Sequence, residues 1–132
     1  MHFFSSEKAL HSLLLYAAYG WLILSGFLHF VVDVLSQYFR AKRAAGPATT
    51  LYYGLNSTYA LSQVLFAALA LFAIRQGMTS MGKVDGLVLG FLAACAWFVL
   101  CLLFIEYPQP RIAVVIFGAL LTGVAVTGLS FS

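Results

Sequence analysis

The sequence predicts an all-α integral membrane protein, built as a bundle of four antiparallel transmembrane helices. Two observations carry this prediction: the composition of the chain and the spacing of its apolar segments. Of the 132 residues, 63% are hydrophobic and 8% are charged, whereas a soluble globular domain carries about 25% charged residues to face water. A bilayer removes that requirement, because lipid tails tolerate an apolar exterior.

Four apolar segments follow one another along the chain, with short polar connections between them. Each has about 18–26 residues, the length that a helix needs to cross a hydrocarbon core of about 30 Å. The first segment is too long for the apolar region of a signal peptide, so we expect it to stay in the protein. Short connections make consecutive helices antiparallel neighbours within one transmembrane domain that covers residues 1–132. The predicted spans are residues 10–35, 51–74, 86–105 and 112–129.

Capping and turn residues set the expected ends of these helices. Thr49 and Thr50 stand just before the second span, and Asp85 stands just before the third. Their side chains are of the kind that caps a helix N-terminus. Pro108 and Pro110 predict a tight turn that stops the third helix and starts the fourth.

Basic residues predict the orientation of the bundle. Loops on the cytoplasmic side of a membrane carry an excess of Lys and Arg. The first and third loops carry four such residues: Arg40, Lys42, Arg43 and Arg111. The opposite side carries three: Lys8, Arg75 and Lys83. The dense cluster in the first loop favours a cytoplasmic first loop and both termini outside. The basic residues are too few and too scattered for nucleic-acid binding.

The two cysteines, Cys95 and Cys101, lie in the same apolar segment. On a helix they are roughly 9 Å apart along the axis, which is too far for a disulfide within the chain. We therefore interpret both as packing residues.

Polar side chains form a stripe on each of the first two predicted helices. At about 100° per residue, the first stripe covers an arc of roughly 80° and the second an arc of about 60°. The first stripe consists of Ser25, His29 and Asp33, and the second of Tyr52, Asn56, Tyr59 and Gln63. Because polar groups inside a membrane are costly, they mark candidate functional positions.

The antiparallel arrangement places both stripes in the half of the membrane next to the first and third loops. Glu106 ends the third span on that side, and Arg111 opens the fourth. The candidate ligand-binding residues are therefore His29, Asp33, Tyr52, Asn56, Tyr59, Gln63, Glu106 and Arg111. Glycines dominate the opposite half, and we expect them at helix contacts. They are Gly86, Gly90, Gly123 and Gly128.

Each polar group has a functional and a structural interpretation. His29 and Asp33 suit proton uptake and release, or a divalent metal with Glu106 as third ligand, or a plain structural hydrogen bond. The second stripe suits a pocket for a ligand with a polar head and an apolar body, or hydrogen bonds between helices. For Glu106 and Arg111 we favour a salt bridge across the turn.

Three classes of function fit these features. The first is a protein that binds or carries a lipophilic small molecule with proton coupling, and the second is an accessory subunit of a larger membrane complex. The third is an intramembrane enzyme that uses His29 with Asp33 or Glu106 as acid and base. No nucleophile paired with a base, phosphate loop or complete metal-ligand set is visible, so an enzyme is least favoured. Expected partners are membrane lipids, a lipophilic ligand, and further copies or subunits.

Overall fold

The computed structural model describes residues 2–129, with side chains from residue 6 onward. Within this part the chain is helical apart from short connections, which confirms the all-α prediction. The long helices are α1 (His2–His29), α3 (Pro47–Arg75), α4 (Val84–Phe104) and α5 (Gln109–Leu129). The short ones are a π-helical turn η1 (Phe30–Leu35), α2 (Ser36–Phe39) and a 3₁₀ turn η2 (Thr79–Gly82).

Four continuous helical segments are long and apolar enough to cross a membrane, as the sequence predicts. They are Ser6–Phe39, Pro47–Arg75, Val84–Phe104 and Gln109–Leu129. The first has 34 residues and is roughly 50 Å long, because the chain stays helical through η1 to Phe39 instead of ending at residue 35. It is longer than a hydrocarbon core of about 30 Å. The protein is therefore a multi-pass integral membrane protein whose first helix is longer than the apolar layer is thick.

The start of α3 differs from the prediction. The helix begins at Pro47. Proline suits this first position because the backbone N–H that it lacks would have no hydrogen-bond partner within the helix. Thr49 and Thr50 lie inside the first turn and do not cap it. Their hydroxyls instead donate to the carbonyl oxygens of Ala44 at 2.6 Å and Gly46 at 3.3 Å.

The start of α4 also differs, whereas the turn before α5 is confirmed. Lys83 occupies the N-cap position of α4 and makes no side-chain cap, so the prediction of Asp85 as the cap is wrong. Asp85 lies in the first turn, where its negative charge interacts favourably with the helix dipole. α5 begins at Gln109 and has Pro110 in its first turn, directly after the turn that the prolines predict.

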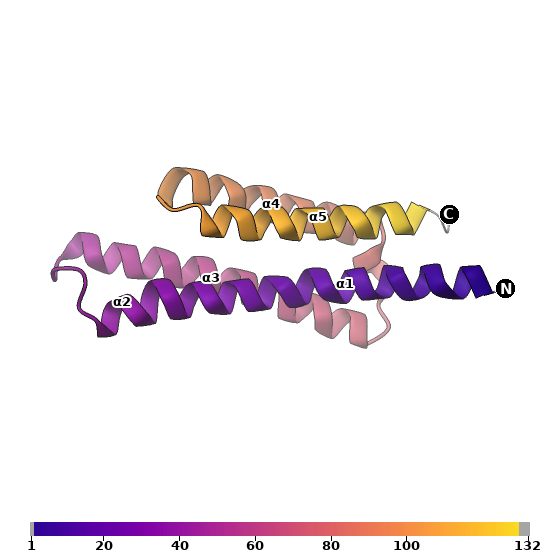
Figure 1. The fold of residues 1–132 in the computed structure, drawn as a ribbon, viewed down its shortest axis with the longest axis horizontal. Helices are drawn as coiled ribbons and strands as arrows, with labels where there is room; N and C mark the ends of the chain where they lie inside the picture. The colour runs from indigo at the N-terminus through magenta and orange to yellow at the C-terminus, as the bar shows by residue number, and fades with distance from the viewer. Residues whose placement is uncertain (1, 130–132) are drawn as a thin grey trace.

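The helices form two antiparallel hairpins, α1–α3 and α4–α5 (Figure 1). α1 is central, since it packs against both α3 and α5, and α4 packs against α5. The start of α1 and the end of α5 lie at one end of the bundle, and the loops 40–46 and 105–108 lie at the other. At the loop end, the α1–α3 hairpin projects past the α4–α5 turn.

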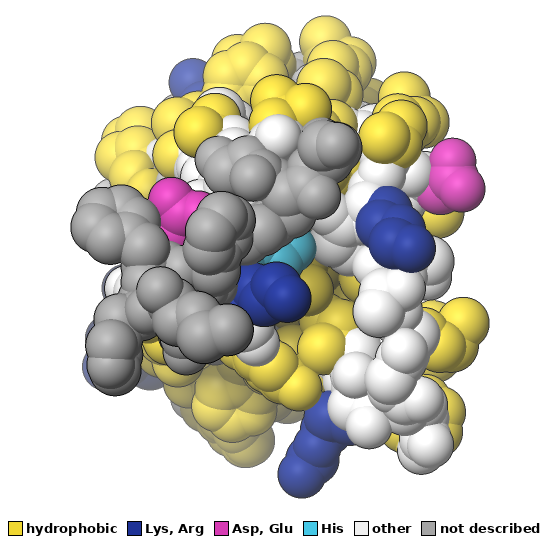
Figure 2. All heavy atoms as spheres, turned by 90° about the vertical axis from the view of Figure 1, so that its right-hand side faces the viewer, with side chains coloured by type: hydrophobic (Ala, Val, Ile, Leu, Met, Phe, Trp, Pro, Cys, Tyr) yellow, Lys and Arg dark blue, Asp and Glu magenta, His cyan; other side chains and the backbone are white. Residues whose placement is uncertain are grey.

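Large apolar side chains fill the space between the helices. Tyr19, Leu22, Phe117 and Leu121 are fully buried, and the rings of Tyr19 and Phe117 meet edge to face at 5.7 Å. Leucines and phenylalanines also cover the outside of the bundle. Figure 2 looks at the end where α1 starts, where Lys, Arg, Asp and Glu side chains and polar groups lie on this face and hydrophobic side chains extend around its edge. An apolar exterior of this kind contacts membrane lipid.

The prediction of close helix contacts is confirmed for Gly90, Gly123 and Gly128, whereas Gly86 meets the turn η2 and Gly118 of the fourth span has no atom within 4 Å of an added Cβ. A Cβ atom on Gly86 would meet the backbone of Met81 and the carbonyl oxygen of Ser80. A Cβ on Gly90 would lie 2.8 Å from a methyl group of Leu121. For Gly123 and Gly128 the nearest atoms, in Leu14 and His11, would lie at 3.3 Å and 3.4 Å.

Candidate functional site

His29 lies between two polar partners at the loop end of the bundle. Its Nδ1 lies 3.0 Å from Oδ2 of Asp33, and its Nε2 lies 3.0 Å from Oδ1 of Asn56. His29 and Asn56 are only 8% and 2% exposed. The structure thus brings together three of the predicted residues from two different helices, and they face one another as expected.

The π-helical turn η1 follows directly after His29 and contains Asp33. Its hydrogen bonds close over five residues, as the bond from the Ser36 N–H to the Val31 carbonyl oxygen shows. Such a turn holds more residues than an α-helical turn, so side chains four apart lie within a single turn. π-helical turns are rare and frequently occur at functional sites.

The orientation of the Asn56 amide determines how many protons this cluster holds. Its Nδ2 donates to the carbonyl oxygen of Tyr52 at 2.8 Å, so its Oδ1 faces Nε2 of His29. An amide oxygen only accepts hydrogen bonds, and so does an ionised carboxylate. Both ring nitrogens of His29 therefore face acceptors. A neutral imidazole carries one proton, and on Nε2 it is donated to Asn56. The contact with Asp33 then requires a second proton, either on Nδ1 of His29 or on the Asp33 carboxyl group.

Two tyrosine rings enclose the cluster. Tyr59, a predicted residue on α3, meets the His29 ring edge to face at 5.0 Å. Tyr107, from the α4–α5 turn, stacks near His29 at 6.3 Å and donates to Oδ1 of Asn56 at 3.4 Å. Burial raises the pKa of the Tyr107 hydroxyl above its ordinary value, and the nearby Asp33 carboxylate raises it further. Tyr107 therefore stays protonated as a hydrogen-bond donor.

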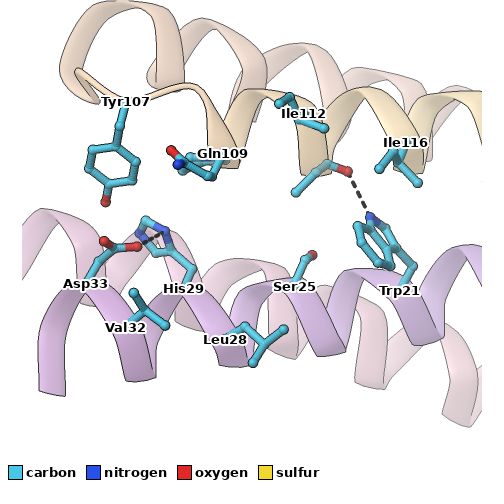
Figure 3. Close-up of a pocket in the computed structure, with 12 residues that line it drawn as sticks. Trp21, Ser25, Leu28, His29, Val32, Asp33, Tyr107, Gln109, Ile112 and Ile116 are labelled. Atoms are coloured by element: carbon cyan, nitrogen blue, oxygen red, sulfur yellow. Dashed lines mark hydrogen bonds and ion pairs between the residues drawn. The ribbon is translucent and has the colours of Figure 1, made fainter. Parts of the chain in front are cut away.

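A pocket of about 510 Å³ lies between α1 and α5, with this cluster at one end (Figure 3). Its rim contains Leu28, Val32 and Ile112, which are 50%, 57% and 56% exposed. These exposed apolar side chains lie in membrane-spanning helices, so this part of the rim faces lipid. The other lining residues are Trp21, Ser25, His29, Asp33, Tyr107, Gln109, Pro110, Ala113 and Ile116.

Trp21 borders the other end of the pocket. Its indole Nε1 donates to the carbonyl oxygen of Ala113 at 2.9 Å and so links α1 to α5 (Figure 3). Sequence reasoning missed Trp21, Tyr107 and Gln109. A tryptophan in an apolar run gives no polar signal, and Tyr107 and Gln109 lie on either side of Pro108 in the predicted turn, where polar residues are common.

A second, smaller pocket of about 120 Å³ lies on the side of the loops. Asn56, Tyr52 and Glu106 line it, together with Arg43 from the first loop and with Tyr107. Tyr107 lines both pockets. It therefore lies between the larger pocket and the pocket beside the loops.

Tyr52 and Gln63, the two ends of the second stripe, lie outside the His29 cluster. The guanidinium of Arg43 lies 3.5 Å from the centre of the Tyr52 ring, and Gln37 donates to the Tyr52 hydroxyl at 3.2 Å. Gln63 is buried deeper in the bundle, and its Nε2 has no hydrogen-bond partner among the described residues. Neither residue lines the larger pocket.

Tyr59 links the cluster to α4. Its hydroxyl oxygen accepts a hydrogen bond from the thiol of Cys101 at 3.1 Å. Cys95 is exposed and Cys101 is buried, and both are free thiols, as their spacing predicts.

The guanidinium of Arg111 binds the end of α4 instead of forming the predicted salt bridge with Glu106. It donates to the carbonyl oxygens of Ile105 at 2.7 Å and Cys101 at 3.4 Å. The last carbonyls of a helix have no partner within the helix, so a cation close to them is strongly favoured. Glu106 is exposed.

A metal site with Glu106 as third ligand does not form. Within the described part of the chain, no three His, Cys, Asp or Glu side chains are grouped so that they could hold a metal ion. His29 and Asp33 form a hydrogen-bonded pair.

The fold and the pocket together define the class of this protein. It is a four-helix, multi-pass integral membrane protein with a polar cluster at one end of a pocket between its first and last helices. No protein-family model, curated protein or solved structure matches the chain.

Proposed function

We propose that the protein binds an amphiphilic small molecule that enters the pocket between α1 and α5 from the bilayer. The polar group of the ligand contacts His29, Asp33 and Tyr107, and its apolar body lies along α5 toward Trp21. The observation that supports this proposal is the division of the pocket, with an apolar rim exposed in the membrane and a buried polar cluster at one end.

The polar end has to supply the affinity. Lipid tails are as apolar as the pocket wall, so apolar contacts alone do not favour the pocket over the bilayer. A hydrogen bond in a region of low dielectric constant is stronger than in water. The polar group of an amphiphile gains such bonds at the cluster, where Asp33, Tyr107 and Gln109 all line the pocket.

A substitution that fills the pocket should remove the ligand. Ala113 lines the pocket, and its carbonyl oxygen accepts the hydrogen bond from Trp21. Ala113→Phe therefore occupies the space and leaves that hydrogen bond in place. Ala119, on the same helix, is exposed and does not line the pocket, so Ala119→Phe is the matched control.

The measurement is mass spectrometry of amphiphiles that co-purify with the protein in a mild detergent. We expect wild type and Ala119→Phe to retain a molecule that is enriched over the bulk lipids. We expect Ala113→Phe to lose at least about nine-tenths of it, which corresponds to a loss of about 1.4 kcal/mol or more in binding. The same co-purifying molecules in all three proteins would contradict the proposal.

We also propose that the loops 40–46 and 105–108 face the cytoplasm and that both termini lie outside. The dense basic cluster at residues 40–43 supports this orientation. Reporter fusions after Ser132 and at Ala44 test it. We expect the fusion after Ser132 to report an outside position and the fusion at Ala44 a cytoplasmic one, and the reverse pair of results would overturn the orientation.

A further inference from the structure

We infer that the ligand is a cationic amphiphile and that its binding releases the second proton of the His29–Asp33 pair. This inference rests on the proposed function and specifies the chemistry of the same pocket. It follows from the charges that line the pocket and from the hydrogen bonds of His29.

The charges that line the pocket favour a cation. No Lys or Arg is among the lining residues, and Asp33 is the only carboxylate. An anionic head group would meet the Asp33 carboxylate and no Lys or Arg, and both nitrogens of the His29 ring already face acceptors. A cation finds the Asp33 carboxylate and, at the same end of the pocket, the aromatic ring of Tyr107, whose face attracts positive charge.

The hydrogen bonds of His29 couple the cation to a proton. With its second proton, the His29–Asp33 pair is neutral overall, as imidazolium with carboxylate or as imidazole with carboxylic acid. A bound cation beside this pair would leave an uncompensated positive charge in a medium of low dielectric constant, which is strongly unfavourable. Loss of one proton restores neutrality. The N–H or O–H bond between the two residues breaks, the electron pair stays on His29 or Asp33, and the proton passes to water.

The groups around the pair identify it as the place where this proton is held. Tyr59 from α3 and Tyr107 from the α4–α5 turn face the His29 ring, and Cys101 of α4 faces Tyr59. Tyrosine and cysteine ordinarily lose their protons only above neutral pH. The pocket residues of α5 do not titrate, and they are Gln109, Pro110, Ile112, Ala113 and Ile116.

Charged groups behind Tyr107 belong to the smaller pocket. Arg43 lies over the Tyr52 ring, and the exposed Glu106 lines the same pocket. This loop-side pocket also contains Asn56, the hydrogen-bond partner of His29. We infer that a proton that leaves the pair passes toward the loops through this pocket.

The probe for the test is (11-bromoundecyl)trimethylammonium, whose charge does not depend on pH and whose bromine quenches tryptophan fluorescence. The protein has two tryptophans, so Trp97→Phe leaves Trp21, at the far end of the pocket, as the only reporter. The protein is held in nanodiscs of phosphatidylcholine, which has no net charge. A pH indicator in weak buffer counts released protons in both wild type and Trp97→Phe, so the proton count does not depend on that substitution.

We expect binding to release about one proton for each cation bound, and the affinity to rise by up to about tenfold per pH unit where the pair titrates. Asp33→Asn should lose this proton release and weaken binding at least about tenfold. Asp85→Asn removes an exposed carboxylate from the first turn of α4, and it should behave as wild type.

The outcomes separate this inference from the proposed function. Equal binding of the neutral probe 11-bromoundecanol, without proton release, would overturn the inference and leave the proposed function in place. Tighter binding of 11-bromoundecanoate, an anion, would do the same. The last comparison is between the Trp97→Phe protein and the Trp97→Phe/Ala113→Phe protein. If none of the three probes quenches Trp21 more strongly in the first than in the second, both the inference and the proposed function are overturned.

Discussion

Replacing His29 and Asp33 together by leucine should cost less stability than replacing His29 alone. In His29→Leu the Asp33 carboxyl group, with a side chain only 14% exposed, loses its partner at 3.0 Å. Removing one member of a buried pair costs about 3–5 kcal/mol, whereas replacing both by apolar residues is often neutral. Because Asp33 keeps some exposure, we expect the lower end, about 3 kcal/mol, for the single variant.

A double-mutant cycle measures this coupling as the free energy of unfolding in mixed micelles. The four proteins are wild type, His29→Leu, Asp33→Leu and the double variant. We expect the double variant to recover at least about 1 kcal/mol relative to the sum of the singles. Additive losses would mean that the contact between His29 and Asp33 contributes nothing, and the proton argument would fail with it.

Asn56→Leu should destabilise the protein by about 2–3 kcal/mol, although leucine is apolar and lies in a membrane helix. Oδ1 of Asn56 accepts hydrogen bonds from His29 and from Tyr107. Leucine leaves the buried His29 donor without this acceptor, which costs about 1–3 kcal/mol, and it removes one acceptor from the half-buried Tyr107 hydroxyl. The lower half of that range applies to Tyr107, because its bond is long at 3.4 Å.

Thr58→Leu is the matched control for Asn56→Leu. Thr58 lies on the same helix two residues later, and its side chain is exposed. Leucine on a lipid-facing position is favourable, so we expect Thr58→Leu to melt at or above the temperature of wild type. If Asn56→Leu melted at the same temperature as Thr58→Leu, the amide would have no role in holding the cluster together.

The spans and the position of the polar cluster were predictable from the sequence, for physical reasons. A hydrocarbon core of about 30 Å requires long apolar runs, and these runs stand out in the chain. Spacings of four residues place His29 with Asp33 on one helix face. Antiparallel pairing then brings Asn56 to the same depth, which the structure confirms at 3.0 Å from His29.

The sequence did not reveal the features that depend on how distant helices pack. The pocket lies between the first and last helices, and the hydrogen bond between Trp21 and Ala113 spans 92 residues of sequence. No local pattern marks this pairing, so the pocket between these helices was not predictable. The π-helical turn at Phe30–Leu35 contains neither glycine nor proline, and so has no sequence signal either.

Local rules also failed where a nearer partner was available. Thr50 suits a helix cap, but Pro47 starts the helix three residues earlier and leaves the hydroxyl facing the Gly46 carbonyl. Arg111 suits a salt bridge with Glu106, but the end of α4 offers it the carbonyl oxygens of Cys101 and Ile105. In each case the side chain donates its hydrogen bond to a backbone carbonyl oxygen instead of forming the predicted cap or salt bridge.

The central claim is that the pocket between α1 and α5 holds a ligand whose polar group contacts His29 and Asp33. The most direct measurement is an experimental density map of the wild-type protein, purified in mild detergent and crystallised from a lipidic phase. We predict elongated non-protein density in this pocket, with its head within hydrogen-bond distance of Asp33 and its tail toward Trp21. A pocket closed by direct contact between α1 and α5, with no density beside His29, would contradict the claim.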